Sequence, residues 1–239
     1  MIDLHCHLLP GIDDGSKTFD ESLAILQNAA REGITDIVIT PHYVKGTRYN
    51  IDNAAKAQLL SELRQKAAHL PLNLYLGNEV FLDTELLPLI QSGQIATLNN
   101  SRYLLLELPL RAEVRQADQI IFELISAGYI PIIAHPERYE YFQQNPTKIL
   151  PFLRLGCLMQ GDYQSLLGRY GRQAEKTLKI FLRRGQIHLL ASDTHHSTDA
   201  YHLKEAYTKT TKITKNPALT QKLFEGNPCQ ILTGQIINH

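Results

Sequence analysis

Short apolar runs alternate with longer segments of helical periodicity along most of the chain. Several runs are hydrophobic at nearly every position, which is typical of parallel strands covered on both faces. We expect strands at seven runs: Ile2–Cys6, Ile34–Thr40, Leu72–Gly77, Tyr103–Leu108, Ile130–Ala134, Cys157–Gln160 and His188–Ala191.

Helix boundary signals lie between these runs. Thr18-Phe19-Asp20-Glu21 has the sequence of a capping box, and Asn145 followed by Pro146 is typical of a helix start. A helical pattern also covers Ala54–Leu70. Helices are expected to end at four glycines that each precede a strand: Gly33, Gly128, Gly156 and Gly185.

This alternation predicts an α/β fold with a parallel sheet, in one domain that spans residues 1–239. Seven strands in a chain of this length favour a closed or distorted barrel over an open doubly wound sheet. The first strand is not followed by Gly-x-Gly-x-x-Gly, which argues against a dinucleotide-binding fold.

Composition narrows the classes of function. The formal net charge is zero, so a nucleic-acid binder that relies on a broad basic field is not expected. The three cysteines form no Cys-x-x-Cys pair, which argues against a disulfide framework and a thiolate zinc site. Because we find no targeting segment and no apolar run that would span a bilayer, we expect a cytoplasmic protein without membrane insertion.

Histidines and carboxylates follow most of the predicted strands. His5 and His7 are two residues apart on the first strand and so project to one face. The carboxyl ends of barrel strands are where functional side chains gather. Any one such residue is explained equally well by a solvated loop, but the whole set favours a metal cluster. Its members are His5, His7, Asp14, His42, Glu79, Glu107, His135, Asp193 and His195.

Imidazole and carboxylate ligands suit manganese, iron, zinc or magnesium. Nine ligands exceed the needs of one ion, and with bridging carboxylates they suit about three divalent ions. Three such ions against four carboxylates leave a net positive charge of about two, which attracts a phosphate dianion and favours hydroxide formation from water.

Several motifs together resemble the PHP (polymerase and histidinol phosphatase) superfamily. Within it, the chain resembles the bacterial manganese-dependent tyrosine-protein phosphatases of capsule and exopolysaccharide loci. The motifs are His5-Cys6-His7, Asp13-Asp14-Gly15, Thr40-Pro41-His42, Gly77-Asn78-Glu79, Glu107-Leu108, Ala134-His135-Pro136-Glu137-Arg138-Tyr139 and Ser192-Asp193-Thr194-His195. The resemblance extends to about Asn227 and implies a distorted (β/α)7 TIM-like barrel with three metal ions, most typically Mn²⁺.

The resemblance also implies roles for individual residues. One ion would be held by His5, His7, Glu79 and Asp193. A second would share Glu79 and add Glu107 and His135, and a third would take Asp14, His42 and His195. Arg138 would contact the phosphate, and Arg138, Asp14 and His42 are the candidate catalytic residues. The implied substrate is phosphotyrosine, typically on the tyrosine-rich tail of the kinase that controls polysaccharide export.

We expect a metal-activated hydroxide to attack phosphorus while Arg138 pairs with the phosphate oxygens. A cysteine-based route is excluded because no cysteine is followed by arginine in a Cys-x5-Arg loop. Lys45 and Arg48, in the loop after His42, are candidate substrate-binding residues, although solvated loop charges explain them as well.

Two alternatives stay open at this point. One is a PHP phosphatase for a small phosphomonoester such as histidinol phosphate, although such enzymes usually have histidine where Asp14 and Glu107 stand here. The other is a non-catalytic, metal-bound regulatory protein. It is favoured by the lack of a second arginine, which relatives have shortly after Ser-Asp-x-His; His202 and Lys204 are candidate substitutes.

Overall fold

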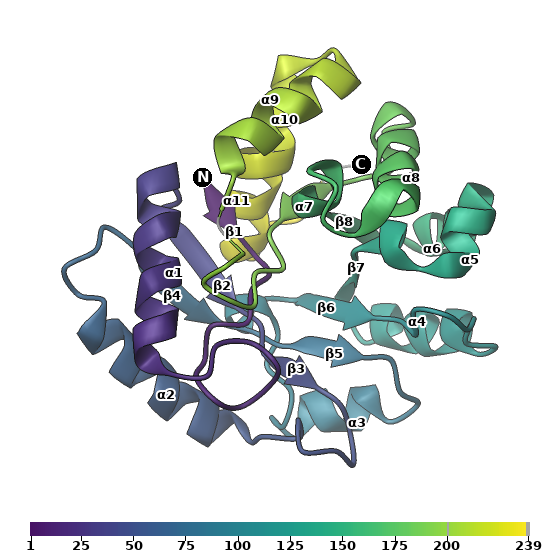
Figure 1. Ribbon diagram of the computed structural model, residues 1–239. Coiled ribbons are helices and arrows are strands. Elements are labelled where there is room, and N and C mark those ends of the chain that lie inside the picture. Colours follow the sequence, from purple (N-terminus) through teal and green to yellow (C-terminus); the bar gives the residue numbers. More distant parts are fainter. Residues whose placement is uncertain (200, 238–239) are drawn as a thin grey trace.

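Nine short strands form two parallel sheets in a computed structural model that describes residues 1–199 and 201–237 (Figure 1). Ala200 and the last two residues lie outside the described part of the chain. The strands are β1 (Ile2–Asp3), β2 (Asp36–Ile39), β3 (His42–Tyr43), β4 (Asn73–Leu76), β5 (Glu79–Phe81), β6 (Tyr103–Glu107), β7 (Ile130–Ala134), β8 (Leu158–Asp162) and β9 (Leu189–Ala191). One sheet has the order β1-β2-β4, and the other has the order β3-β5-β6-β7-β8-β9.

The second and third predicted strands correspond to β2 and β4, and each is followed after a short break by a further strand that was not predicted, β3 or β5. Proline lacks the N–H that a strand ladder needs, so Pro41 marks the break between β2 and β3. Gly77 stands at the other break, where a Cβ atom would lie 2.8 Å from Leu98 Cδ2. The Asn78 side chain joins the two breaks, because it donates to the Pro41 carbonyl at 2.8 Å and accepts from the buried Lys56 Nζ at 2.7 Å.

The first and last strands lie side by side. The described strand β1 is shorter than predicted, but Cys6 forms an isolated parallel bridge with Thr194. Asp193 N donates to the His5 carbonyl, and His7 N donates to the Thr194 carbonyl, each at 2.9 Å. If β2 with β3 and β4 with β5 are each counted as one strand, the strands have the arrangement of a distorted seven-stranded barrel, in agreement with the predicted fold class.

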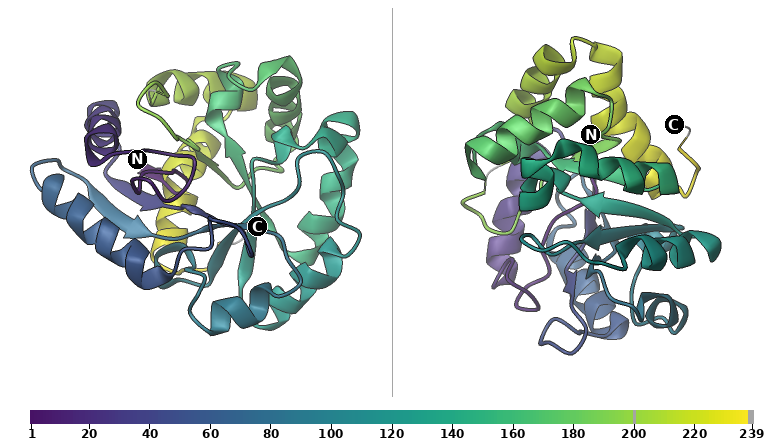
Figure 2. Two further views of the ribbon diagram at one scale, coloured as in Figure 1. Left: turned by 60° about the horizontal axis from the view of Figure 1, so that its bottom comes forward. Right: turned by 90° about the vertical axis from the view of Figure 1, so that its right-hand side faces the viewer.

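Helices surround the strands (Figure 2). They are α1 (Phe19–Glu32), α2 (Asn53–Lys66), α3 (Leu86–Gln91), α4 (Ala117–Ser126), α5 (Glu140–Gln144), α6 (Leu150–Leu155), α7 (Tyr163–Leu166), α8 (Gly171–Arg183), α9 (Leu203–Thr214), α10 (Pro217–Gln221) and α11 (Asn227–Leu232). Shorter turns are η1 (Leu98–Asn100), η2 (Pro136–Arg138), η3 (Pro146–Ile149) and η4 (Lys222–Gly226). Among the described residues, no helix is both long and apolar enough to cross a membrane.

Most of the predicted helix boundaries agree with the structure. Thr18 caps α1 by accepting from Glu21 N at 3.2 Å. The Glu21 carboxylate accepts from Lys17 N at 2.8 Å, one residue before the position that a capping box uses. Asn145 caps η3 as predicted, but α2 ends at Lys66, four residues earlier than expected.

The inside of the barrel is apolar. A cluster that includes Leu4, Val38 and Leu105 fills it between the two sheets. Ile231 of α11 belongs to the same cluster, and the hydroxyl of Tyr103, the first residue of β6, donates to the Gln235 carbonyl at 2.7 Å. The C-terminal segment therefore closes the amino ends of the strands, which leaves the carboxyl ends for the polar side chains.

Candidate metal centre

All nine predicted ligands lie together at the carboxyl ends of the strands. Eight of them form three groups whose donor atoms lie within 4.8 Å of one another, and the ninth, His135, has its Nε2 atom 2.9 Å from Glu79 Oε1. The three groups are His5, His7, Glu79 and Asp193; His7, Asp14, His42 and His195; and His42, Glu79 and Glu107. Parallel strands place their carboxyl ends at one edge, which is why residues so far apart in sequence meet.

The first group is fully buried, and we call it the floor: His5, His7, Glu79 and Asp193. The Nε2 atoms of His5 and His7 face each other at 3.2 Å. His5 Nε2 also lies 3.1 Å from Asp193 Oδ1 and 3.3 Å from Glu79 Oε2. Two imidazole nitrogens directed at each other and at two carboxylate oxygens fit a cation placed among them.

The rim is formed by Asp14, His42 and His195, which are nearer to solvent. His42 Nε2 and His195 Nε2 lie 3.3 and 3.6 Å from Asp14 Oδ1. The Asp14 side chain is 52% exposed, compared with 2% for Asp193. The rim therefore offers the same donor types in a more hydrated setting.

Glu79 joins the floor to the rim. Its Oε2 lies 3.0 Å from His42 Nδ1, and its Oε1 lies 2.9 Å from His135 Nε2. Glu107 lies farther from the same two histidines. Its Oε2 is 3.9 Å from His42 Nδ1, and its Oε1 is 3.7 Å from His135 Nε2. His42 thus approaches both glutamates, a contact that the predicted ligand sets did not include.

The charges of this cluster shift its pKa values in the metal-free protein. Burial lowers the pKa of His5, but the charges of Glu79 and Asp193 outweigh burial and raise that pKa well above its usual range. Burial and the charge of Glu79 raise the pKa of Glu107 to about 8. Against burial, Glu79 raises the pKa of His42 to about 10. Without cations the cluster retains protons, as expected of a site with excess negative charge.

Two residues that the sequence interpretation missed orient the floor histidines. His5 Nδ1 donates to Gln160 Oε1, and His7 Nδ1 donates to Asp13 Oδ2, each at 2.8 Å. These bonds leave the Nε2 atoms as acceptors for a cation, as is usual for metal-binding histidines. The sequence contains a signal for Asp13, which is adjacent to the predicted ligand Asp14. Gln160 is the last residue of the predicted strand Cys157–Gln160, to which no site residue was assigned.

Restricted backbone conformations help to place the candidate ligands. A Cβ atom on Gly15 would lie 2.1 Å from the His7 carbonyl oxygen, so only glycine fits there. His135 and Asp193 have left-handed backbone, with φ of 32° and 47°. Non-glycine residues rarely adopt it, and such strain is concentrated at functional sites.

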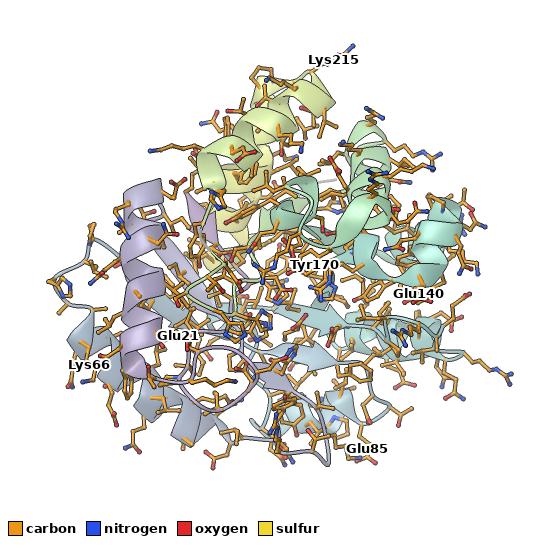
Figure 3. The ribbon with its side chains drawn as sticks, in the orientation of Figure 1. Glu21, Lys66, Glu85, Glu140, Tyr170 and Lys215 are labelled. Carbon is orange, nitrogen blue, oxygen red and sulfur yellow. The ribbon has the colours of Figure 1, made fainter. Side chains whose placement is uncertain are left out.

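Arg138, the residue predicted to contact the phosphate, lies at the edge of the floor. Its guanidinium pairs with the Asp193 carboxylate and lies 3.9 Å from Asp162 Oδ2. It also stacks at 4.3 Å from the centre of the Tyr170 ring. Figure 3 labels Tyr170, which lies just before α8 at the front of the barrel. The sequence did not indicate Asp162 or Tyr170 as neighbours of this arginine.

A family described as "Capsular polysaccharide synthesis, CpsB/CapC" matches residues 1–233. The chain belongs to this family.

Individual proteins are also similar to this chain. The tyrosine-protein phosphatase YwqE of Bacillus subtilis (strain 168) is 34% identical over 209 residues, which cover 86% of this chain and 82% of YwqE. The tyrosine-protein phosphatase CpsB of Streptococcus pneumoniae is 29% identical over 245 residues, 99% of this chain and 100% of CpsB. A crystal structure from a study of these two proteins, described as metal-dependent tyrosine phosphatases, has a TM-score of 0.94 at 32% identity and covers 100% of this chain and 96% of that chain.

The two loop cations proposed for substrate binding in this CpsB/CapC family member make contacts of their own. Lys45 Nζ pairs with Glu85 at 2.6 Å. Arg48 donates to the Tyr49 hydroxyl at 3.0 Å, and the Tyr49 ring lies 5.8 Å from the His42 ring. Arg48 therefore borders the rim through Tyr49, whereas Lys45 is engaged with another side chain.

A second arginine from an unexpected part of the chain is linked to the rim through Asp199. Arg169 pairs with Asp199 Oδ1 at 2.6 Å, and Asp199 accepts from His195 N at 3.2 Å. Arg169 comes from the segment between α7 and α8, not from the residues after His195 where relatives were expected to have an arginine. Lys204 instead lines a surface hollow on α9 with Lys209 and Lys212.

Proposed function

We propose that this chain is a metal-dependent protein-tyrosine phosphatase that hydrolyses phosphotyrosine. Membership of the CpsB/CapC family supports the activity, since relatives are named as tyrosine-protein phosphatases. The observation that supports it most is the buried floor, where His5 and His7 direct facing Nε2 atoms at two carboxylates beside Arg138. The proposal treats residues 1–239 as one catalytic domain.

The proposed ligands are the nine residues of the floor, the rim and their neighbours: His5, His7, Asp14, His42, Glu79, Glu107, His135, Asp193 and His195. Three ions are proposed because the donors fall into three overlapping groups. Mn²⁺ suits this mixture of imidazole and carboxylate ligands. When bound, such ions act as Lewis acids that polarise phosphoryl oxygens and lower the pKa of water.

Arg138 is proposed to bind and orient the phosphoryl group. Its planar guanidinium can pair with two phosphate oxygens, and contact with Asp193 and Tyr170 fixes its position. The charge of Asp193 raises the pKa of Arg138 against the effect of burial, so this cation stays protonated. It can therefore stabilise negative charge that develops on the phosphoryl oxygens.

Asp14 and His42 are proposed to act at the entrance, because they are the rim residues between the buried floor and solvent. The leaving group of phosphotyrosine is a phenolate with a pKa of about 10, so it needs less protonation than an alkoxide. Aryl phosphates are therefore expected to react faster than alkyl phosphates. This preference distinguishes the proposal from a phosphatase for a small alkyl phosphomonoester.

The proposed substrate is a phosphotyrosine protein, in particular the tyrosine-rich tail of a kinase that controls capsule or exopolysaccharide synthesis. The family description supports a role in capsular polysaccharide synthesis. A cytoplasmic location, and the absence of nucleic-acid partners, stay predictions from the sequence.

The test is turnover by protein loaded with Mn²⁺. We expect hydrolysis of a phosphotyrosine peptide and of p-nitrophenyl phosphate, little hydrolysis of a matched phosphoserine peptide, and loss of activity with EDTA. His135→Ala should abolish turnover, whereas His69→Ala, which changes an exposed histidine outside the cluster, should not. Hydrolysis of small phosphomonoesters but not of the peptide would indicate that the substrate is a small phosphomonoester. No turnover at full metal loading would refute the phosphatase proposal.

A further inference from the structure

The outer face of α8 has a row of four positively charged side chains. Arg172, Lys176, Lys179 and Arg183 are spaced by four, three and four residues, which places them in one row along the helix. The opposite side packs into the core through residues such as Leu178 and Phe181, so the four cations face outward. We call these four residues the α8 row. The chain has no net charge, so its overall composition does not explain the row.

The one acidic residue of α8 is already paired. Glu175 Oε1 lies 2.6 Å from Lys179 Nζ and 3.3 Å from Lys209 Nζ of the neighbouring α9. Arg172, Lys176 and Arg183 are exposed and make no ion pair with the described residues. Lys209 of α9 shares Glu175 with Lys179, so one carboxylate faces two cations at this edge of the row. The surface therefore has cations available for an anionic partner.

The row begins next to the candidate active site. Tyr170, whose ring stacks on Arg138, directly precedes the first residue of α8. Arg169, which is linked to the rim, precedes Tyr170. From Arg172 to Arg183 the helix rises about 16 Å, which is the length of about five residues of extended peptide. A polypeptide with its phosphotyrosine beside Arg138 has a short path to these cations.

A merely solvated surface explains the row less well. Like charges four residues apart, such as Arg172 with Lys176 and Lys179 with Arg183, repel and destabilise a helix slightly. A membrane surface also fits poorly, because α8 has no exposed large hydrophobic side chain among its described residues to insert into a bilayer. A narrow row of cations suits an extended acidic segment better.

We propose that the α8 row is a docking surface for an acidic segment of the phosphotyrosine-containing polypeptide. Glutamate or aspartate side chains that flank the phosphotyrosine pair with the row, which raises the local concentration of substrate at the site. The inference rests on the proposed phosphatase activity and adds a preference among phosphotyrosine substrates.

The test uses the full chain loaded with Mn²⁺ and two phosphotyrosine peptides of equal length, one flanked by glutamates and one by glutamines. A variant with Arg172→Gln, Lys176→Gln and Arg183→Gln removes the three charges of the row that have no ion pair with the described residues. The matched control has Arg31→Gln, Lys66→Gln and Arg102→Gln, which removes three exposed charges on other elements. Thermal denaturation verifies that both variants fold, and p-nitrophenyl phosphate reports chemistry that is independent of docking.

We expect the wild type and the control to prefer the acidic peptide by about 10-fold in kcat/KM at low salt, as several exposed ion pairs would give. The preference should vanish in the α8 variant and weaken with salt, while p-nitrophenyl phosphate turnover stays unchanged. Active enzyme with no preference, or a preference that the α8 variant keeps, would overturn the docking surface and leave the phosphatase proposal intact. Failure to hydrolyse either peptide would refute both. Binding to phosphatidylglycerol vesicles through the row, without any peptide preference, would overturn the proposal and indicate that the row binds a membrane surface.

Discussion

The floor and the rim of the metal centre use the same kinds of donor atom in different surroundings. Floor residues are fully buried, and three of the four, His5, His7 and Asp193, lie where the first and last strands meet, with Asp193 N bonded to the His5 carbonyl at 2.9 Å. The rim includes a loop aspartate, Asp14, whose side chain is 52% exposed. The floor therefore contributes both to barrel closure and to the site, whereas the rim contributes mainly to the site.

Burial sets the size of the expected effects. Removing one partner from a buried charged group leaves the others uncompensated, which is strongly destabilising. A partly exposed group is screened by water, so the loss of its charge should matter less. Substitutions in the two regions should consequently differ in stability as well as in activity.

The largest effect is expected for Asp193→Asn in the floor. It keeps the shape of the side chain but removes the charge that faces His5 and Arg138. Since even the outer partners of metal ligands affect metal affinity or activity by 10- to 100-fold, we expect kcat/KM to fall by at least about 100-fold. Metal content by mass spectrometry and turnover of p-nitrophenyl phosphate measure this. A variant with full metal content and near-normal turnover would contradict the role of the floor.

Arg138→Lys should have the next largest effect. Lysine keeps the charge but loses the planar fork and the stacking on Tyr170. One hydrogen bond to a charged group contributes about 1.5–3 kcal/mol, so kcat/KM for a phosphotyrosine peptide should fall by about 10- to 100-fold. Bound metal should stay unchanged, in contrast to the floor variant. Arg154→Lys, on the exposed face of α6, provides the control. Loss of metal instead of substrate affinity would assign Arg138 to the metal site.

Asp14→Asn should affect activity less, by about 10-fold, with little change in thermal stability. The reason is that Asp14 is half exposed and contacts only the rim histidines. Metal titration should reveal the loss of one ion while the floor keeps its own. A fall in melting temperature as large as that of Asp193→Asn would remove the distinction between rim and floor.

The smallest effect concerns pH. In the metal-free protein the pKa of His42 is raised to about 10 and that of Glu107 to about 8. The folded protein thus keeps protons that the unfolded chain releases near pH 6.5 for histidine and pH 4.5 for glutamate, so raising the pH from 6.5 to 8 lowers stability. The melting temperature of the metal-free protein should fall over this interval, and stabilisation by Mn²⁺ should grow. A melting temperature that rises with pH without metal would contradict this sign.

The sequence was sufficient to predict that the candidate ligands lie together, because nearly all of them follow an apolar run and parallel strands bring such positions to one edge. His5, Glu79 and Asp193 were found in this way, and the structure brings them together. Strands β3 and β5, which begin just after Pro41 and Gly77, were missed, because they form by pairing with residues that are distant in sequence.

The residues around the ligands were mostly missed for the same reason. Asp13, Gln160 and Tyr170 act through contacts with His7, His5 and Arg138. Apart from the position of Asp13 beside Asp14, nothing in their local pattern indicates these contacts. Arg169 is linked to the rim from another segment than the one where an arginine was expected. A local pattern identifies which residues can bind a metal, but the tertiary fold decides which side chains support them.

The most direct measurement is phosphotyrosine-peptide turnover by metal-stripped protein as Mn²⁺ is added. If the floor and rim form a catalytic metal centre, turnover is absent without metal, rises as the ions bind and reaches a plateau at about three ions per chain. Turnover that persists in metal-free protein, or protein that binds its full complement of Mn²⁺ and stays inactive, would contradict a metal-dependent tyrosine phosphatase.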